Sequence, residues 1–185
     1  MANNEFGYTA WGKDWIRLAE PLRQTRPEPL LPRARRVARN DGVAVTIDGH
    51  TVRASIHRGG QASVTYLEVE PMSRGTIETI GAVIGDPTVL TDDMHRAALA
   101  AGARLAPIVT ATDCSCKARS PRCLHVLATY YDVARRVDDH PRLALEIQGY
   151  FQGGQPDSEA APQEHRWIPI STLDPADYFA VAAPG

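Results

Sequence analysis

The sequence predicts a small α+β fold, in which an antiparallel three-stranded meander with flanking helices is followed by a small ββα-like finger. Three observations predict this fold. Apolar and polar residues alternate between residues 42 and 70, with two glycine turns inside the run. Apolar residues recur at helical spacing on both sides of that region. All three cysteines lie within ten positions of one another, in the stretch CSCKARSPRCLH at 114–125.

The N-terminal region, residues 1–106, is expected to open with a short amphipathic helix. In the segment WGKDWIRLAEPL, the apolar residues Trp11, Trp15 and Leu18 recur at helical spacing. Large aromatic side chains supply much of the area that a core buries, so both tryptophans are assigned to the core. Pro21 limits this helix. The following run RPEPLLP is not expected to form a regular helix, because proline disrupts one.

The meander at 42–70 is predicted because the spacing of apolar residues changes there from helical spacing to alternation. Val43, Val45 and Ile47 alternate with small or polar residues, as the two faces of a strand require. An Asp-Gly pair supplies a hairpin turn, and a Gly-Gly pair supplies a second one. The expected strands are residues 43–47, 51–56 and 63–69.

Helices are expected over much of the remaining chain, up to a flexible tail. The segments with helical character are 76–84, 91–102, 123–137 and 142–150. Residues 107–150 are assigned to the finger and its following helices, with 107–112 as an extended lead into the cysteines. Residues 151–185 are assigned to a flexible linker and a C-terminal docking segment, because GGQPDSEAAPQEH has the composition of a linker.

The cysteine cluster has the spacing of a metal site. Cys114 and Cys116 are two residues apart, so an extended segment would point both sulfurs to one side. On a helix, residues two apart point to nearly opposite sides, so Cys123 and His125 are expected where the loop enters the next helix. Three thiolates and one imidazole at tetrahedral corners fill all four positions around Zn2+. The ion would then stabilise the finger as a structural ion.

The alternatives to zinc are a redox pair and three incidental buried cysteines. A disulfide between Cys114 and Cys116 would close a strained small ring, and a redox site of the thioredoxin type would prefer C-x-x-C. Incidental cysteines would be scattered along the chain. The start of the chain has no signal-peptide pattern, and no apolar run reaches the roughly 20 residues that span a membrane. A cytoplasmic location is therefore expected, where clustered cysteines more often bind metal than form disulfides.

Basic residues are unevenly distributed, although the formal net charge is only -2. Between Lys13 and Arg39 there are eight basic and three acidic residues. Arginine suits bidentate contact with phosphate. The residues expected to contact a nucleic acid or another partner are Arg33, Arg35, Arg36, Arg39, Lys117, Arg119 and Arg122. Two alternatives remain open. The four arginines between 33 and 39 could simply form a solvated face, and the three basic residues between 117 and 122 could simply compensate the charge of the thiolates.

The pattern C-x-C-x6-C-x-H, followed by an apolar helix, resembles the SWIM zinc finger. WGKDW, the block RARRVARNDGVAVTIDGHTVRASIHRG, the segment DHPRLALEIQGY and the closing LDPADYFA are also similar to bacterial SWIM proteins. The resemblance covers most of the chain. It implies binding of DNA or protein, often beside a helicase-like partner such as an Snf-type ATPase, without known catalytic residues.

These patterns together predict a zinc-binding subunit or adaptor that binds nucleic acid, DNA in the first place or else RNA, and that works with an Snf-type ATPase. The alternative is a protein–protein interaction subunit with no direct nucleic-acid contact. The near-neutral net charge favours that alternative, since dedicated nucleic-acid binders are usually more basic. No P-loop, nucleophile-elbow or zinc-protease motif occurs, so neither an enzyme nor a small-molecule substrate is expected.

Overall fold

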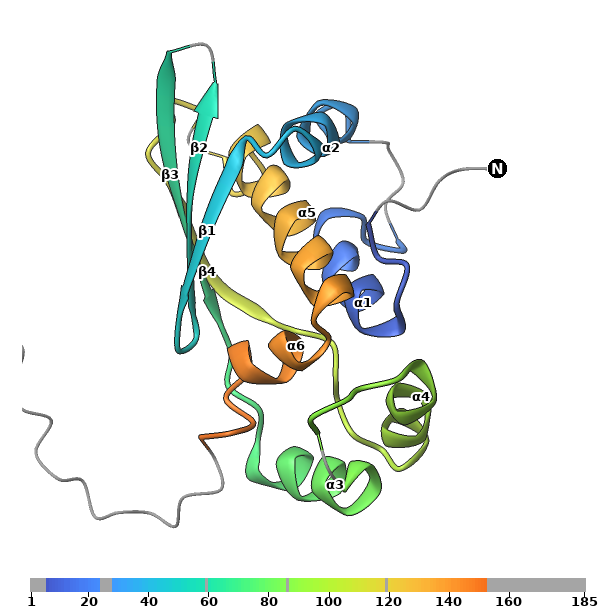
Figure 1. Ribbon diagram of the computed structural model, residues 1–185. Helices are drawn as coiled ribbons and strands as arrows, with labels where there is room; N and C mark the ends of the chain where they lie inside the picture. Colours follow the sequence, from blue (N-terminus) through green and yellow to red (C-terminus); the bar gives the residue numbers. More distant parts are fainter. Residues whose placement is uncertain (1–5, 24–27, 59, 86, 119, 153–185) are drawn as a thin grey trace, which may run out of the picture. The chain divides into compact units, whose positions relative to one another are not determined.

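A four-stranded antiparallel sheet with the order β1-β2-β3-β4 organises the protein (Figure 1). The computed structural model describes residues 6–23, 28–58, 60–85, 87–118 and 120–152, all within one compact unit. The strands are Val43–Asp48 (β1), Thr51–Arg58 (β2), Gln61–Val69 (β3) and Val109–Cys114 (β4). The helices are Ala10–Ala19 (α1), Leu31–Arg39 (α2), Arg74–Ile84 (α3), Asp92–Ala100 (α4), Leu124–Asp139 (α5) and Arg142–Ile147 (α6). The predicted α+β class is confirmed.

The predicted meander is confirmed as β1, β2 and β3, and a fourth strand extends it. The segment at 107–112, expected only as an extended lead into the cysteines, contributes most of β4. This strand pairs with β3 so that Thr112 lies opposite Leu67. Residue alternation predicts that a segment is extended, but not which distant strand supplies its hydrogen bonds. The local pattern therefore does not predict this pairing.

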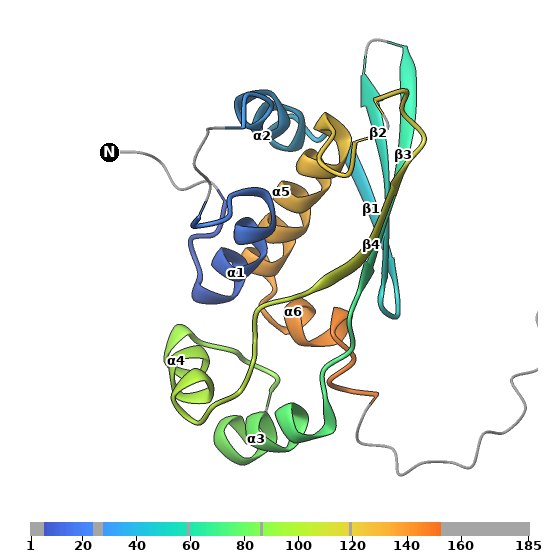
Figure 2. The ribbon, with the colours of Figure 1, turned by 180° about the vertical axis from the view of Figure 1, so that it is seen from behind.

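Helix α5 lies against one face of the sheet and forms the centre of the core (Figures 1 and 2). It contacts β1, β3 and β4 as well as α1 and α2. Both views show α1 and α2 on the same side of the sheet as α5. In β2, Val52, Ala54 and Ile56 are buried, whereas the alternating Arg53 is exposed. The four helices predicted after the meander are confirmed as α3 to α6, with ends that differ by a few residues.

Helix α1 carries the two tryptophans that the sequence assigns to the core. Trp11 and Trp15 are both buried, and α1 packs against α5. Thr9 caps the helix by accepting a hydrogen bond from the Gly12 N–H. Trp11 Nε1 also donates to the Thr91 carbonyl oxygen at the start of α4, at 3.1 Å. The predicted helix and its buried face are therefore confirmed.

The proline-rich run RPEPLLP is not helical at 28–30, as predicted, but a helix starts within its last two residues, where the prediction is wrong. Leu31 and Pro32 form the first turn of α2. Proline is tolerated there because the first N–H groups of a helix have no partner within the helix. Ala34 and Ala38 then bury one face of α2, which packs against α5. Small alanines beside four arginines give a weak apolar pattern, which explains why the hydrophobic periodicity does not reveal this helix.

The predicted boundary between residues 106 and 107 lies between elements that share one core. Strand β4 belongs to the same sheet as the meander, and α5 contacts α1 and α2. The predicted linker and docking segment at 151–185 lies outside the described residues except for its first two positions. Within the described ranges, no helix has both the length and the apolar character needed to cross a membrane.

Candidate metal centre

The four residues of the cysteine cluster come together between the end of β4 and the start of α5. Cys114 is the last residue of β4, and Cys116 lies in the bend that follows it. Cys123 is the N-cap of α5, and His125 is the second residue of that helix. Their ligand atoms, three sulfurs and one imidazole nitrogen, all lie within 4.8 Å of one another. The first pair thus lies at the end of a strand and in the bend after it, not along one extended segment as expected, and the second pair lies at a helix entrance as expected.

One pair of these atoms has the separation that a tetrahedral metal ion requires. Cys114 Sγ lies 3.8 Å from His125 Nδ1. Ligand atoms at the usual distances from a zinc-sized ion, placed at tetrahedral corners, are roughly 3.5–3.8 Å apart. Cys123 is 2% exposed and the other three side chains are half-buried, so the protein shields much of the site from water. The cluster could therefore hold a four-coordinate metal ion.

Backbone hydrogen bonds hold each pair of ligands in place. Between the first two cysteines, the Ser115 N–H donates to the Val64 carbonyl oxygen and Ser115 Oγ accepts from the Val64 N–H, both at 2.9 Å. The Cys123 N–H donates to the Ser120 carbonyl oxygen at 3.1 Å, which closes a turn before α5. The Cys123 carbonyl oxygen then accepts from the Leu127 N–H at 3.0 Å. Sheet and helix therefore both fix the ligand positions.

The electrostatics of the cluster link metal binding to the loss of a proton. Burial raises the pKa of the Cys114 thiol to about 12; a hydrogen bond from the Cys116 backbone opposes this shift, and the side chains of Cys116 and Cys123 add to it. At neutral pH this thiol is protonated in the metal-free protein, so a bound metal ion would displace the proton. Cys123 is the N-cap of α5, and the positive end of the helix dipole favours thiolate charge there.

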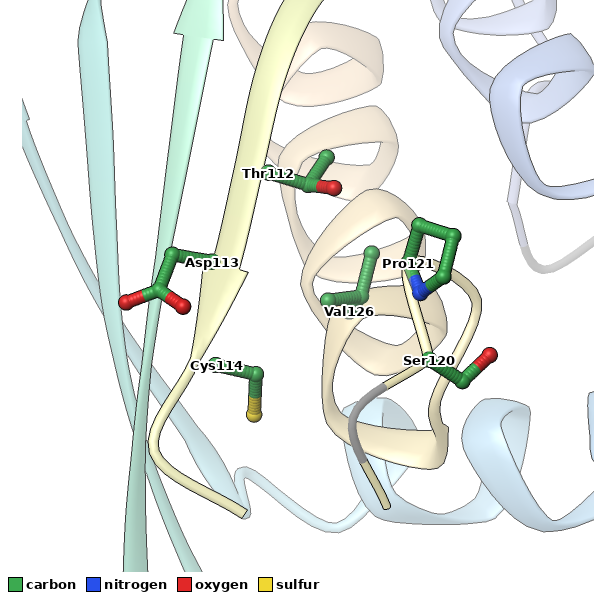
Figure 3. A pocket seen from close by; sticks show the side chains of 6 residues that line it. All are labelled: Thr112, Asp113, Cys114, Ser120, Pro121 and Val126. Atoms are coloured by element: carbon green, nitrogen blue, oxygen red, sulfur yellow. The ribbon is translucent and has the colours of Figure 1, made fainter. Parts of the chain in front are cut away.

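A hollow of about 330 Å³ opens beside the cluster, between β4 and the turn that precedes α5 (Figure 3). Its lining residues are Thr112, Asp113, Cys114, Ser120, Pro121 and Val126. Figure 3 shows the Cys114 side chain projecting into the space between the strand and the turn. The hollow gives a path from solvent to one side of the cluster, through which a metal ion could enter.

Two of the arginines predicted to contact a partner are bound within the protein. Arg122 lies on the loop at 115–122, which we call the metal loop. It donates to the carbonyl oxygens of the last two residues of α1, at 3.1 and 2.7 Å. Arg35 pairs with Glu20 at 2.5 Å and donates from Nε to the Tyr131 hydroxyl at 3.1 Å. Both guanidinium groups therefore join elements of this protein to one another.

The other predicted contact residues include an exposed stripe. Arg33, Arg36 and Arg39 recur every three residues along α2 and are all exposed, and we call α2 the arginine helix. Lys117 is exposed on the metal loop. Arg119 lies outside the described residues. Five of the seven predicted contact residues are therefore exposed in the described part of the chain, and one of them, Arg35, is also paired with Glu20.

Two buried aspartates that the sequence analysis did not single out hold α1 in place. Asp14 Oδ2 lies 2.8 Å from His95 Nε2 of α4, and both side chains are buried. Asp138, near the end of α5, accepts hydrogen bonds from the Gly7 and Thr9 N–H groups at 2.5 and 2.9 Å. The sequence signal for Asp14 is its place between two tryptophans on an apolar helix face.

The cluster offers a metal ion four protein ligands, so such an ion would hold structure together rather than bind a substrate. The arginine helix adds a basic surface to the same fold. No protein-family model matches the chain, and searches of the curated proteins and of the solved structures return no match.

Proposed function

We propose that the cluster binds Zn2+ as a structural ion. Three thiolates and one imidazole form a ligand set that structural zinc sites use. Four protein ligands leave no position for water or substrate, so the proposed role is binding without catalysis. The observation that carries the proposal is the approach of all four ligand atoms to within 4.8 Å of one another.

We also propose that the chain is a SWIM-type protein. The ligand spacing supports this, as do the similar segments outside the finger. In the structure three of these segments contribute α1, α2 with the first two strands, and α6, whereas the closing LDPADYFA lies outside the described residues. Each of the three places buried side chains in the core that surrounds α5. These three segments therefore help to form the core around the helix that follows the metal centre.

The proposed partner of the arginine helix is the phosphate backbone of a nucleic acid, with DNA as the first candidate. The helix contains four arginines and no acidic residue. All four are exposed, and Arg33, Arg36 and Arg39 recur at a spacing that places them along one side. The guanidinium fork fits phosphate oxygens, and Lys117 on the metal loop offers a further positive charge. A few phosphate contacts on a protein of net charge -2 suit an adaptor that works with a larger partner, such as an Snf-type ATPase.

Exchanging Arg33 and Arg36 for glutamine is expected to weaken binding to duplex DNA by roughly 10- to 100-fold at low salt. Each lost phosphate contact should also reduce the slope of log affinity against log salt by about 1. The measurement is a salt titration of fluorescence anisotropy with zinc-loaded protein.

The matched control exchanges Arg74 and Arg96 for glutamine, since both are exposed arginines on other helices. This variant removes the same charge and is expected to bind as the wild type does. Equal losses in the two double variants would show that net charge, and not the arginine helix, governs binding. Absence of binding by zinc-loaded wild type at low salt would reject the nucleic-acid proposal and favour the protein–protein interaction subunit.

A further inference from the structure

Arg122 joins the metal loop to the end of α1. It immediately precedes the cluster residue Cys123, and its guanidinium donates to the Leu18 carbonyl oxygen at 3.1 Å and the Ala19 carbonyl oxygen at 2.7 Å. Carbonyl groups in the last turn of a helix have no donor within the helix and carry the negative end of its dipole. A cation is therefore well placed there. The Arg122 side chain is only 33% exposed, so these bonds are partly shielded from water.

The same guanidinium reaches the segment that leads into the arginine helix. Arg122 Nε lies 4.0 Å from Glu28 Oε2. The Glu28 carboxylate accepts a hydrogen bond from the Leu30 N–H at 3.4 Å. The backbone carbonyl oxygen of Glu28 accepts one from the Leu31 N–H at 3.2 Å. Leu31 is the first residue of α2. One side chain of the metal loop therefore lies against both the end of α1 and the start of α2.

A contact from α5 also holds the end of α1. Glu20, the residue after α1, pairs with Arg35 of α2 and accepts a hydrogen bond from the Tyr131 hydroxyl of α5. The end of α1 is thus held by the metal loop, by α2 and by α5. Polar contacts run without a break from the residue next to Cys123 to the first turn of the arginine helix.

We propose that Arg122 is a positioning residue, through which metal binding at the cluster fixes the end of α1 and the start of the arginine helix. A metal ion restrains Cys123, and the adjacent Arg122 is restrained with it. A restrained side chain loses less conformational entropy when it forms its hydrogen bonds. Metal binding and the helix contacts therefore stabilise each other, and by linkage the effect is equal in both directions. The proposal rests on the proposed metal binding of the cluster and not on nucleic-acid binding.

The first test is the zinc affinity of the full-length Arg122→Gln variant, measured by competition with a chromophoric chelator. Arg122 is not a ligand, yet we expect Arg122→Gln to bind zinc roughly tenfold more weakly than the wild type, as for the loss of one charge-assisted interaction. Arg122→Lys keeps a cation and is expected to recover part of the affinity. The control Lys117→Gln removes the same charge from the same loop and is expected to change the affinity by less than about twofold.

Hydrogen exchange of the zinc-saturated proteins separates positioning from general destabilisation. In Arg122→Gln, amides at 17–20 and at 30, 31, 33 and 34 are expected to exchange roughly tenfold faster, whereas amides at 127–134 of α5 keep their protection. Zinc affinity equal to that of the wild type, or unchanged exchange at the end of α1, would overturn the proposal. A wild-type protein that binds no zinc would instead overturn the proposed metal site, and the coupling with it.

Discussion

Replacing Cys123 with serine is expected to lower the free energy of unfolding by at least about 4 kcal/mol, which is the stabilisation from a ligand present at a thousand times its dissociation constant. The effect is large because Cys123 is a buried ligand and the N-cap of α5, the helix at the centre of the core. For a chain of this length the loss corresponds to a fall in melting temperature of roughly 8–16 °C. Thermal unfolding in zinc-containing buffer measures it.

The matched control is a pair of histidine substitutions. His125→Gln removes a ligand and is expected to destabilise the protein in the same way, whereas His57→Gln alters an exposed strand residue and should have little effect. A chelator should lower the melting temperature of the wild type but change that of Cys123→Ser very little. An unchanged melting temperature of the wild type in chelator would contradict a stabilising metal.

Replacing Gly12 with alanine is expected to cost roughly 2–5 kcal/mol in the free energy of unfolding, because overpacking adds to the loss of hydrogen bonds at a buried carboxylate. A Cβ atom at position 12 would lie 2.1 Å from Asp138 Oδ1 and 2.5 Å from its Cγ. Asp138 would have to move away from the Gly7 and Thr9 groups that it accepts hydrogen bonds from. Urea unfolding followed by circular dichroism measures the change.

Gly75→Ala is the matched control for this substitution. Gly75 also lies in a helix, α3, and a Cβ there would meet no described atom within 4 Å. Alanine should therefore stabilise the protein by roughly 0.4–1 kcal/mol, since it reduces the conformational freedom of the unfolded chain. Equal effects of the two substitutions would contradict the tight packing of α1 against α5 at Gly12.

The fold was predictable from the sequence where local periodicity determines it. The strands around the Asp-Gly turn and the helix with Trp11 and Trp15 follow from apolar spacing alone. Strand β4 needs a partner, β3, that is distant in the sequence, and no local pattern identifies it. Helix α2 buries only two alanines and begins at a proline-containing turn, so both of its sequence signals are weak.

In the candidate site, too, the sequence predicts what depends on local spacing and not what depends on contacts between distant residues. All four cluster residues were predictable from their types and spacing, and Cys123 and His125 lie at a helix entrance as expected. Cys116 lies in the bend after β4 and not on the strand, which the spacing alone did not predict. Charge, in contrast, does not reveal whether an arginine faces a partner or its own protein. Arg122 donates hydrogen bonds to carbonyl oxygens at the end of α1, and Arg35 pairs with Glu20, the residue after α1. These internal contacts follow from the arrangement of the helices and not from the local sequence. Asp138 was likewise unpredictable, since its partners lie at the other end of the chain.

The most direct test of the account is the metal content of the purified protein, together with the absorption spectrum of its cobalt-substituted form. The account predicts one zinc ion per chain, and cobalt bands typical of tetrahedral coordination with thiolate-to-metal charge transfer. Those bands should weaken on removal of Cys114, Cys116 or Cys123. A metal-free protein that takes up neither zinc nor cobalt, and whose thiols react freely in the folded state, would contradict the central claim.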